Sequence, residues 1–286
     1  MSTPAKTKTI LLTGATSGIG YQSALQLAKQ GHHVVMVGRD RAKTEKCVAE
    51  VKQATGNANI EFLLCDFASQ ASIRAMAAEA LQKRPRIDVL INNAGTVFDQ
   101  RQLTGDGIEA TWATNHLGYF LLTNLLLERV VASAPARIVV VASTGHYRGT
   151  MDLDDVGFEK GGYGIMKAYQ RSKLGNVLMT RRLAKQLEGK GVTVNALHPG
   201  GVATSIWDGA PGWTQPILAV LKRLVMITPE EGGQTLTYLA TSSEVEGKTG
   251  LYFEKNRPKT AAKLALDDSL AEKVWVKSAA MVGLPG

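Results

Sequence analysis

A tyrosine and a lysine stand four residues apart in the stretch Tyr169-Gln-Arg-Ser-Lys173. In a helix this spacing puts both side chains on one face, so the lysine ammonium lies beside the phenol. A free tyrosine has a pKa of about 10, which suits proton transfer near neutral pH poorly. A neighbouring positive charge stabilises tyrosinate and lowers that pKa. The pair is therefore a candidate acid and base for a reaction that makes or consumes an alcohol.

A second pair, Tyr163 and Lys167, has the same spacing. Tyr163 is flanked by glycines on both sides, and glycine disfavours a helix. The stretch from 168 to 188 is instead a sustained helical pattern without proline. We therefore predict that Tyr169 and Lys173 form the catalytic pair.

The loop Thr13-Gly-Ala-Thr-Ser-Gly-Ile-Gly20 lies between a short apolar strand and a helix. Glycines in such a loop let the backbone approach a pyrophosphate, which then accepts hydrogen bonds from the free N–H groups at the helix N-terminus. The loop therefore predicts a dinucleotide site. Its expected contacts are Gly14, Thr16, Ser17, Gly18, Ile19 and Gly20.

Short apolar runs alternate with helical patterns along most of the chain. The predicted strands are 9–13, 34–37, 60–64, 87–91, 137–141 and 192–197, and the predicted helices are 18–30, 41–54, 69–83, 108–131 and 168–188. Two capping boxes, Thr228 to Glu231 and Ser269 to Glu272, predict the starts of two later helices. The strands are continuous apolar runs, which is typical of strands buried on both faces. We predict an α/β fold, a single doubly wound Rossmann-type domain over residues 1–286, with a seven-stranded, mostly parallel sheet and helices on both faces.

Further motifs follow in a fixed order after the glycine loop. Asn92-Asn-Ala-Gly95 follows the fourth strand, Asn115 lies in the long helix, Ser143 ends the fifth strand and Pro199-Gly200 follows the sixth. With these motifs the chain resembles the short-chain dehydrogenases/reductases over residues 8 to 255. Asn115-His-Leu-Gly118 and His198-Pro-Gly200 are similar to the retinol-dehydrogenase-like group.

The resemblance implies an oxidoreductase that interconverts an alcohol and a ketone or aldehyde by hydride transfer. It implies that Tyr169 is the acid and base, and that Ser143 donates a hydrogen bond to the substrate oxygen. It also implies that Lys173 binds the nicotinamide ribose and that Asn115 holds a water in a proton relay. The alternative from another class is a nonenzymatic NAD(P)-binding sensor or interaction protein. The presence of all four residues argues against that alternative.

The residues at the end of the second predicted strand indicate whether the protein binds NAD or NADP. Gly38 stands where an acidic side chain would accept a hydrogen bond from the ribose 2′-OH of NAD, and Arg39 follows, which suits the 2′-phosphate of NADP. We therefore predict that NADP is preferred. NAD is also possible, because Ser17 stands where many NADP-dependent members of the family have a second basic residue, and because Asp40 can pair with Arg39. The family resemblance implies that Asp66 contacts the adenine, and a helix N-cap role is the alternative. The remaining predicted cofactor contacts are Phe67, Asn93, Ala94, Gly95, Tyr169, Lys173, Pro199, Gly200, Val202 and Thr204.

The amino-acid composition argues against several other classes of protein. The 286 residues are 44% hydrophobic and 20% charged, as in an ordinary globular chain rather than a disordered one. Cys47 and Cys65 have no paired or metal-ligand spacing, so neither a disulfide scaffold nor a metal site is expected. The net charge of +8 comes from small, scattered basic groups, so no nucleic-acid partner is expected.

Location and substrate class rest on two segments. The polar N-terminus leads into three apolar residues, Ile10 to Leu12, too few for a signal segment or a membrane span, so we expect a cytoplasmic protein with no membrane partner. The irregular stretch at about 201–227 carries Trp207 and Trp213 and is the expected substrate lid. It favours a small-molecule alcohol or carbonyl substrate of fairly apolar character. The family resemblance also allows a homodimer or homotetramer built on the two long helices.

Overall fold

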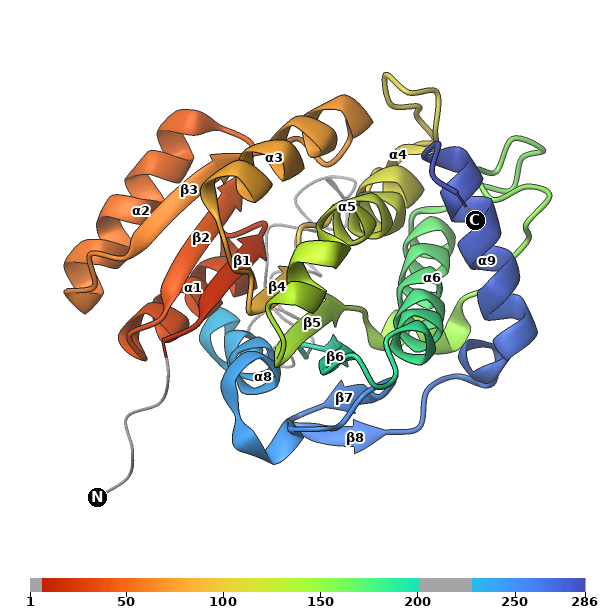
Figure 1. Cartoon of the computed structure of the whole chain (residues 1–286). Coiled ribbons are helices and arrows are strands. Elements are labelled where there is room, and N and C mark those ends of the chain that lie inside the picture. The colour runs from red at the N-terminus through yellow and green to blue at the C-terminus, as the bar shows by residue number, and fades with distance from the viewer. Residues whose placement is uncertain (1–6, 201–227, 286) are drawn as a thin grey trace.

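The computed structural model describes residues 7–200 and 228–285. At its centre lies one eight-stranded sheet with the order β3-β2-β1-β4-β5-β6-β7-β8 (Figure 1). The strands are β1 (Thr9–Thr13), β2 (His33–Gly38), β3 (Ile60–Leu64), β4 (Val89–Asn92), β5 (Ala136–Val141), β6 (Val192–His198), β7 (Tyr252–Glu254) and β8 (Arg257–Lys259). All neighbouring strands pair in parallel except β7 and β8, which pair antiparallel. The predicted doubly wound α/β class is confirmed.

The predicted strand count of seven is wrong by one. The outermost strand, β8, has three exposed residues, Arg-Pro-Lys, and lies at the edge of the sheet. Such a strand has no apolar run, because neither of its faces packs in the core. Hydrophobic patterning therefore gives no signal for it.

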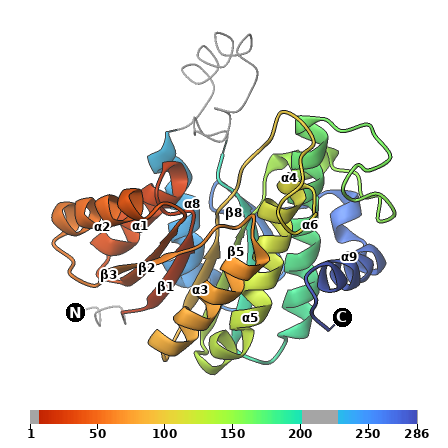
Figure 2. The same ribbon diagram turned by 90° about the horizontal axis from the view of Figure 1, so that it is seen from above.

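Helices cover both faces of the sheet (Figure 2). They are α1 (Gly18–Lys29), α2 (Arg41–Thr55), α3 (Gln70–Lys83), α4 (Ala110–Trp112), α5 (Gly118–Ala132), α6 (Ile165–Gln186), α8 (Pro229–Thr241) and α9 (Asp268–Met281). Short 3₁₀ turns lie at Thr144–Arg148, Ser243–Val245 and Lys263–Leu266. Helices α1, α2 and α8 lie on one face, and α3, α5 and α6 lie on the other.

Successive residues of each central strand enter opposite cores. In β1, Leu11 joins the cluster under α3, α5 and α6, whereas Leu12 joins the cluster under α1, α2 and α8. Both are at most 1% exposed. Because side chains alternate across a strand, burial of both faces demands apolar residues at every position. The continuous apolar runs have this origin.

The helix predicted at 108–131 is interrupted. A short helix, α4, runs into a π-helical turn at Ala113–Leu117, and α5 begins only at Gly118. Within the turn, the backbone carbonyl of Asn115 accepts a hydrogen bond from the side-chain amide of Asn176 at 2.9 Å. A donor from another helix thus takes part in the turn, and residue patterns within 108–131 cannot reveal it.

One of the two predicted capping boxes is confirmed. The Thr228 side chain accepts from the Glu231 backbone, and the Glu231 carboxylate accepts from the Thr228 backbone in return. The predicted box at Ser269 is wrong, because α9 begins at Asp268 with Asp267 as its N-cap. The Asp267 carboxylate accepts from the backbone N–H of Leu270, so the helix start moves two residues toward the N-terminus.

Helix α9 lies along the outer side of α6 (Figure 1). Trp275 of α9 is 5% exposed and packs edge-on against Phe120 of α5, with ring centroids 4.7 Å apart. The guanidinium of Arg182 on α6 lies 4.8 Å from the centroid of the Trp275 ring. The sequence allowed a dimer built on the two long helices, which correspond to α5 and α6. Part of the outer surface of these helices is covered by α9 of the same chain.

Replacing Trp275 by alanine is expected to lower the free energy of unfolding by about 3–5 kcal/mol, because it removes a large buried ring and leaves a cavity. The measurement is chemical denaturation followed by circular dichroism. Val276, the next residue, is 49% exposed. Val276→Ala is the matched control and is expected to stay within about 0.5 kcal/mol of the wild type. An equal loss in both variants would contradict the packing role of Trp275.

In the described part of the chain, no helix has both the length and the hydropathy needed to cross a bilayer. The predicted lid at 201–227, with Val202 and Thr204, lies outside the described residues. That residues 1–286 form a single domain stays a prediction, and so does the oligomeric state of the protein.

Candidate active site

A cavity of about 980 Å³ opens at the carboxyl ends of the parallel strands. Ligand sites of open α/β sheets lie at this edge, where the loops after neighbouring strands meet. Of the predicted site residues, those that line the cavity are Gly14, Thr16, Ser17, Gly18, Ile19, Gly20, Arg39, Asp66, Phe67, Asn93, Ala94, Gly95, Ser143, Tyr169, Lys173, Pro199 and Gly200. Residues separated by up to 186 positions in the sequence thus form one wall.

The glycine loop at one end of the cavity fits a dinucleotide. Gly14 adopts a φ of +64°, and a Cβ on Gly20 would lie 2.1 Å from the carbonyl oxygen of Gly14. The Ser17 side chain at the N-cap of α1 accepts no hydrogen bond from the helix. The first backbone N–H groups of α1 therefore remain available for a pyrophosphate, at the positive end of the helix dipole.

Asn93 supports this loop from behind. Its side-chain Nδ2 donates to the carbonyls of Thr13 and Gly14 at 2.9 and 3.1 Å. The backbone N–H groups of Asn93 and Ala94 donate to the Thr13 hydroxyl at 2.8 and 3.0 Å. The Asn-Asn-Ala-Gly motif therefore ties the end of β4 to the end of β1, which fixes the loop that faces the cavity.

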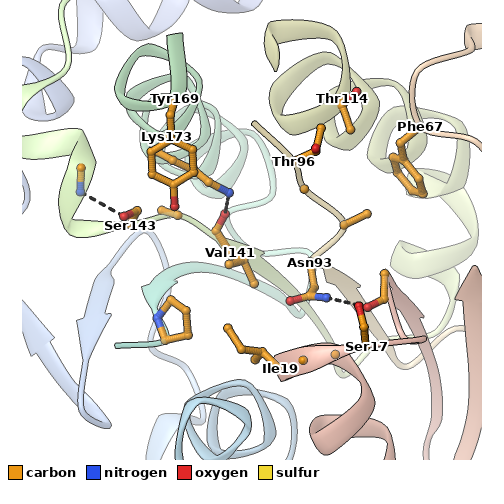
Figure 3. Close-up of a pocket in the computed structure, with 18 of the residues that line it drawn as sticks. Ser17, Ile19, Phe67, Asn93, Thr96, Thr114, Val141, Ser143, Tyr169 and Lys173 are labelled. Atoms are coloured by element: carbon orange, nitrogen blue, oxygen red, sulfur yellow. Dashed lines mark hydrogen bonds between the residues drawn. The ribbon is translucent and has the colours of Figure 1, made fainter. Parts of the chain in front are cut away.

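Lys173 and Tyr169 reach into the other end of the cavity from α6 (Figure 3). Lys173 is 2% exposed, its Nζ donates to the Val141 carbonyl at 3.0 Å, and it lies 5.6 Å from the centroid of the Tyr169 ring. Burial lowers the pKa of Lys173 from 10.5 to about 7. The i, i+4 spacing therefore brings the two side chains onto one face, as predicted.

The Ser143 hydroxyl lies beside Tyr169. Ser143 is 7% exposed, and its Oγ accepts from the backbone N–H of Gly145 at 3.0 Å. Burial raises the pKa of Tyr169, and a hydrogen bond with the Ser143 side chain opposes this rise. Because Gly145 uses the Ser143 oxygen as an acceptor, the hydroxyl proton of Ser143 can be donated elsewhere. The pair can therefore hold one oxygen atom of a substrate and exchange a proton with it.

The competing pair lies apart from this arrangement. Tyr163 precedes α6, and its hydroxyl donates to the Phe98 carbonyl at 2.8 Å. Lys167 is exposed and its Nζ donates to the Gly162 carbonyl at 3.3 Å. In the described part of the chain, neither residue lines the cavity. The geometry favours Tyr169 and Lys173.

Asn115 is placed differently from the other predicted catalytic residues. It is fully buried behind the described cavity wall, where its Oδ1 accepts from the Thr96 backbone and its Nδ2 donates to the Thr96 carbonyl, both at 2.8 Å. Its side chain therefore fixes the loop after β4 at Thr96, next to Gly95. Its backbone carbonyl lies within the π-helical turn.

Asp66 lines the cavity but does not cap α3. The N-cap is Ser69, whose side chain accepts from the Ser72 backbone, whereas the Asp66 Oδ1 accepts from the Ala68 backbone. The alternative of an N-cap role for Asp66 is therefore wrong. The second Asp66 oxygen faces no hydrogen-bond donor in the described residues, which leaves it available to a ligand.

Lys43 is a cavity residue that the sequence reasoning missed. It lines the cavity beside Arg39, and both side chains are exposed and without an ion-pair partner among the described residues. Asp40 was expected to compete for Arg39, but its carboxylate accepts from the Lys43 backbone at 2.7 Å and caps α2. A basic residue in the first turn of the helix after β2 was the available signal.

Metal ligation has no candidate in residues 7–200 and 228–285, which contain no group of three or more His, Cys, Asp or Glu side chains that could hold an ion. One histidine, His198, lines the cavity, and burial lowers its pKa to about 4. It is therefore neutral at pH 7.

Residues 8–214 match the family model of the short chain dehydrogenases. The chain is 41% identical to human retinol dehydrogenase 13, covering 97% of this chain and 85% of that protein, and 44% identical to human retinol dehydrogenase 14, covering 97% and 87%. A crystal structure of actinorhodin polyketide ketoreductase with NADPH superposes with a TM-score of 0.70 at 27% identity, covering 88% of this chain and 97% of that one. The chain therefore belongs to the short-chain dehydrogenase/reductase family and is similar to its retinol dehydrogenases.

Proposed function

We propose that this oxidoreductase uses NADP to interconvert an alcohol and a ketone or aldehyde, with Tyr169 as the acid and base. The observation that carries the proposal is the convergence of Ser143, Tyr169 and Lys173 at one end of the cavity that the glycine loop closes at the other. The bound nicotinamide supplies or accepts the hydride.

Tyr169 handles the proton. In carbonyl reduction the substrate oxygen gains negative charge and must receive a proton, and the raised pKa of Tyr169 keeps the phenol protonated and able to give one. In alcohol oxidation the phenolate is needed, and a protonated Lys173 stabilises it. The Ser143 hydroxyl donates to the substrate oxygen and holds it near the phenol.

Three features around β2 support NADP over NAD. A Cβ on Gly38 would lie 2.2 Å from the Thr44 hydroxyl and 2.6 Å from Thr16 Cγ2, so an acidic side chain does not fit there without movement. Arg39 and Lys43 give two cations for a 2′-phosphate, and Asp40 is engaged as a helix cap. A relative with NADPH in its crystal structure has the same fold.

The substrate is expected to be apolar. Beyond Ser143 and Tyr169 the cavity is lined by Phe98, Tyr147 and Met166, and the last two are 42% and 44% exposed. Large apolar side chains at the mouth of a cavity favour a ligand that covers them. The similarity to two retinol dehydrogenases supports retinol as one candidate among such apolar substrates.

The test mixes the purified protein with NADPH and a panel of carbonyl compounds, and follows the absorbance of the reduced cofactor. The panel contains retinal, a long-chain aliphatic aldehyde, an apolar ketone and a charged keto acid. We expect NADPH oxidation with an apolar member and none with the keto acid. Cofactor binding without oxidation of NADPH by any member would favour the nonenzymatic sensor.

A further inference from the structure

A chain of buried polar side chains connects α9 to the catalytic end of the cavity. It runs from Ser278 on α9 through His116 in the π-helical turn to Asn176 on α6. All three residues are fully buried. None of them belongs to the described lining of the cavity, so the proposed reaction does not explain them.

The hydrogen bonds of this chain have only one consistent direction. The Asn176 Nδ2 donates to the carbonyls of Asn115 and Val141, at 2.9 and 3.3 Å, which uses both of its protons. Its Oδ1 lies 3.1 Å from His116 Nδ1, so that nitrogen must carry the proton. His116 Nε2 then accepts from the Ser278 hydroxyl at 2.9 Å. His116 is a neutral imidazole in one tautomer, in accord with burial lowering its pKa to about 4.

The two carbonyls at the end of this chain belong to the catalytic region. The Val141 carbonyl also accepts from Lys173 Nζ at 3.0 Å, so Asn176 and Lys173 share one acceptor. The Asn115 carbonyl lies in the π-helical turn, and the Asn115 side chain fixes Thr96 in the cavity wall. Asn176 therefore shares one backbone acceptor with Lys173 and also donates to the backbone of Asn115.

Close packing leaves His116 little choice of position. Its ring stacks on Trp112, with ring centroids 4.2 Å apart. A Cβ on Gly175 would lie 2.8 Å from His116 Nδ1 and 2.9 Å from the Trp112 ring. A residue with a side chain at position 175 of α6 would therefore collide with the imidazole of His116. A buried network in which every polar atom has a partner is rigid and specifies one arrangement.

We propose that Asn176, oriented by His116 and Ser278, is a positioning residue that holds Lys173 and Asn115 in place for proton transfer at Tyr169. The proposal rests on the proposed function for the role of Lys173. Asn176 does not touch the reacting atoms. It acts through the shared Val141 carbonyl and through the backbone of Asn115.

The test follows the titration of Lys173 by NMR in protein carrying ¹³C at the lysine Cε, with Lys173→Met to assign the signal. Other titratable groups facing the ammonium are Tyr119 on α5, Tyr169 on α6 and His198 at the end of β6. We expect the wild-type pKa near 7. In Asn176→Ala water can occupy the vacated space and solvate the ammonium, so the Lys173 titration should move upward by about one pH unit. Turnover should fall about tenfold or more.

Two further variants separate positioning from stability. Ser278→Ala removes the far end of the chain while leaving a small buried side chain, and should shift the titration in the same direction by a smaller amount. Thr180→Val is the matched control, because Thr180 is equally buried on α6 and its hydroxyl donates to the Asn176 backbone carbonyl, outside the chain. It should leave the Lys173 titration and kcat unchanged.

The outcomes are distinct from those of the proposed function. An unchanged Lys173 titration in both Asn176→Ala and Ser278→Ala overturns the positioning role, whatever the turnover. A shift of equal size in Thr180→Val also overturns it, because the effect is then general loosening of α6. The Lys173 titration could also shift in Asn176→Ala and Ser278→Ala but not in Thr180→Val, in a protein that reduces no carbonyl compound. That result supports the positioning contact and contradicts the proposed reaction.

Discussion

Replacing Tyr169 by phenylalanine is expected to lower kcat for carbonyl reduction by roughly 100- to 10,000-fold, because the change removes the only group placed to deliver the proton in our proposal. The ring itself stays, so packing around Lys173 and Ser143 is kept. The Kd for NADPH should change less than twofold, roughly within the scatter of a conservative substitution. Single-turnover oxidation of NADPH gives the rate, and fluorescence titration gives the Kd.

Tyr163→Phe is the matched control for this prediction. It also removes one phenolic hydroxyl, but that hydroxyl donates to the Phe98 carbonyl outside the proton path. Turnover in this variant should stay within a few-fold of the wild type, roughly the cost of one neutral hydrogen bond. A large loss in Tyr163→Phe together with full turnover in Tyr169→Phe would exchange the roles of the two tyrosines.

Arg39→Ala and Lys43→Ala are each expected to weaken NADPH binding about tenfold, and the double variant about 100-fold, while NADH binding stays nearly constant. A charge-assisted hydrogen bond to a phosphate contributes about 1.5–3 kcal/mol, and only NADPH has a phosphate at the 2′ position. Kd values for both cofactors, measured at several salt concentrations, check the prediction.

Arg41 provides the control on the same turn of α2. It pairs with Glu45 at 3.1 Å and is absent from the described cavity lining. Arg41→Ala lowers the net charge by the same amount, so a general electrostatic effect would weaken NADPH in this variant as well. If Arg39→Ala and Lys43→Ala weaken NADPH and NADH equally, the 2′-phosphate assignment is wrong.

Local patterns were sufficient for the parts of the fold that alternate between buried strand and helix. The glycine loop, the Tyr169 and Lys173 pair and Ser143 each follow an element whose type is fixed by its own residues, and all of them line one cavity. The ends of parallel strands meet at one edge, so topology brings these residues together once the strand order is known.

Other features depend on partners far away in the chain. The π-helical turn at Ala113–Leu117 receives its extra donor from Asn176, and no pattern near residue 115 contains that information. For the same reason the sequence placed Asn115 in the site but could not place it behind the wall. The polar edge strand β8 lacks an apolar run. Lys43 is different, because its position in the first turn of the predicted helix at 41–54 was already a usable signal.

The hydroxyl that hydrogen-bonds to His116 belongs to Ser278 on α9, and α9 is synthesised after the other helices of this hydrogen-bonded network. Ser278 stands 162 positions after His116. During translation the central strands and α6 leave the ribosome before α9, because they precede it in the sequence. The imidazole of His116 therefore lacks its hydroxyl partner until α9 docks. We therefore expect the catalytic end to reach its final arrangement only after α9 has been made and has packed against α6.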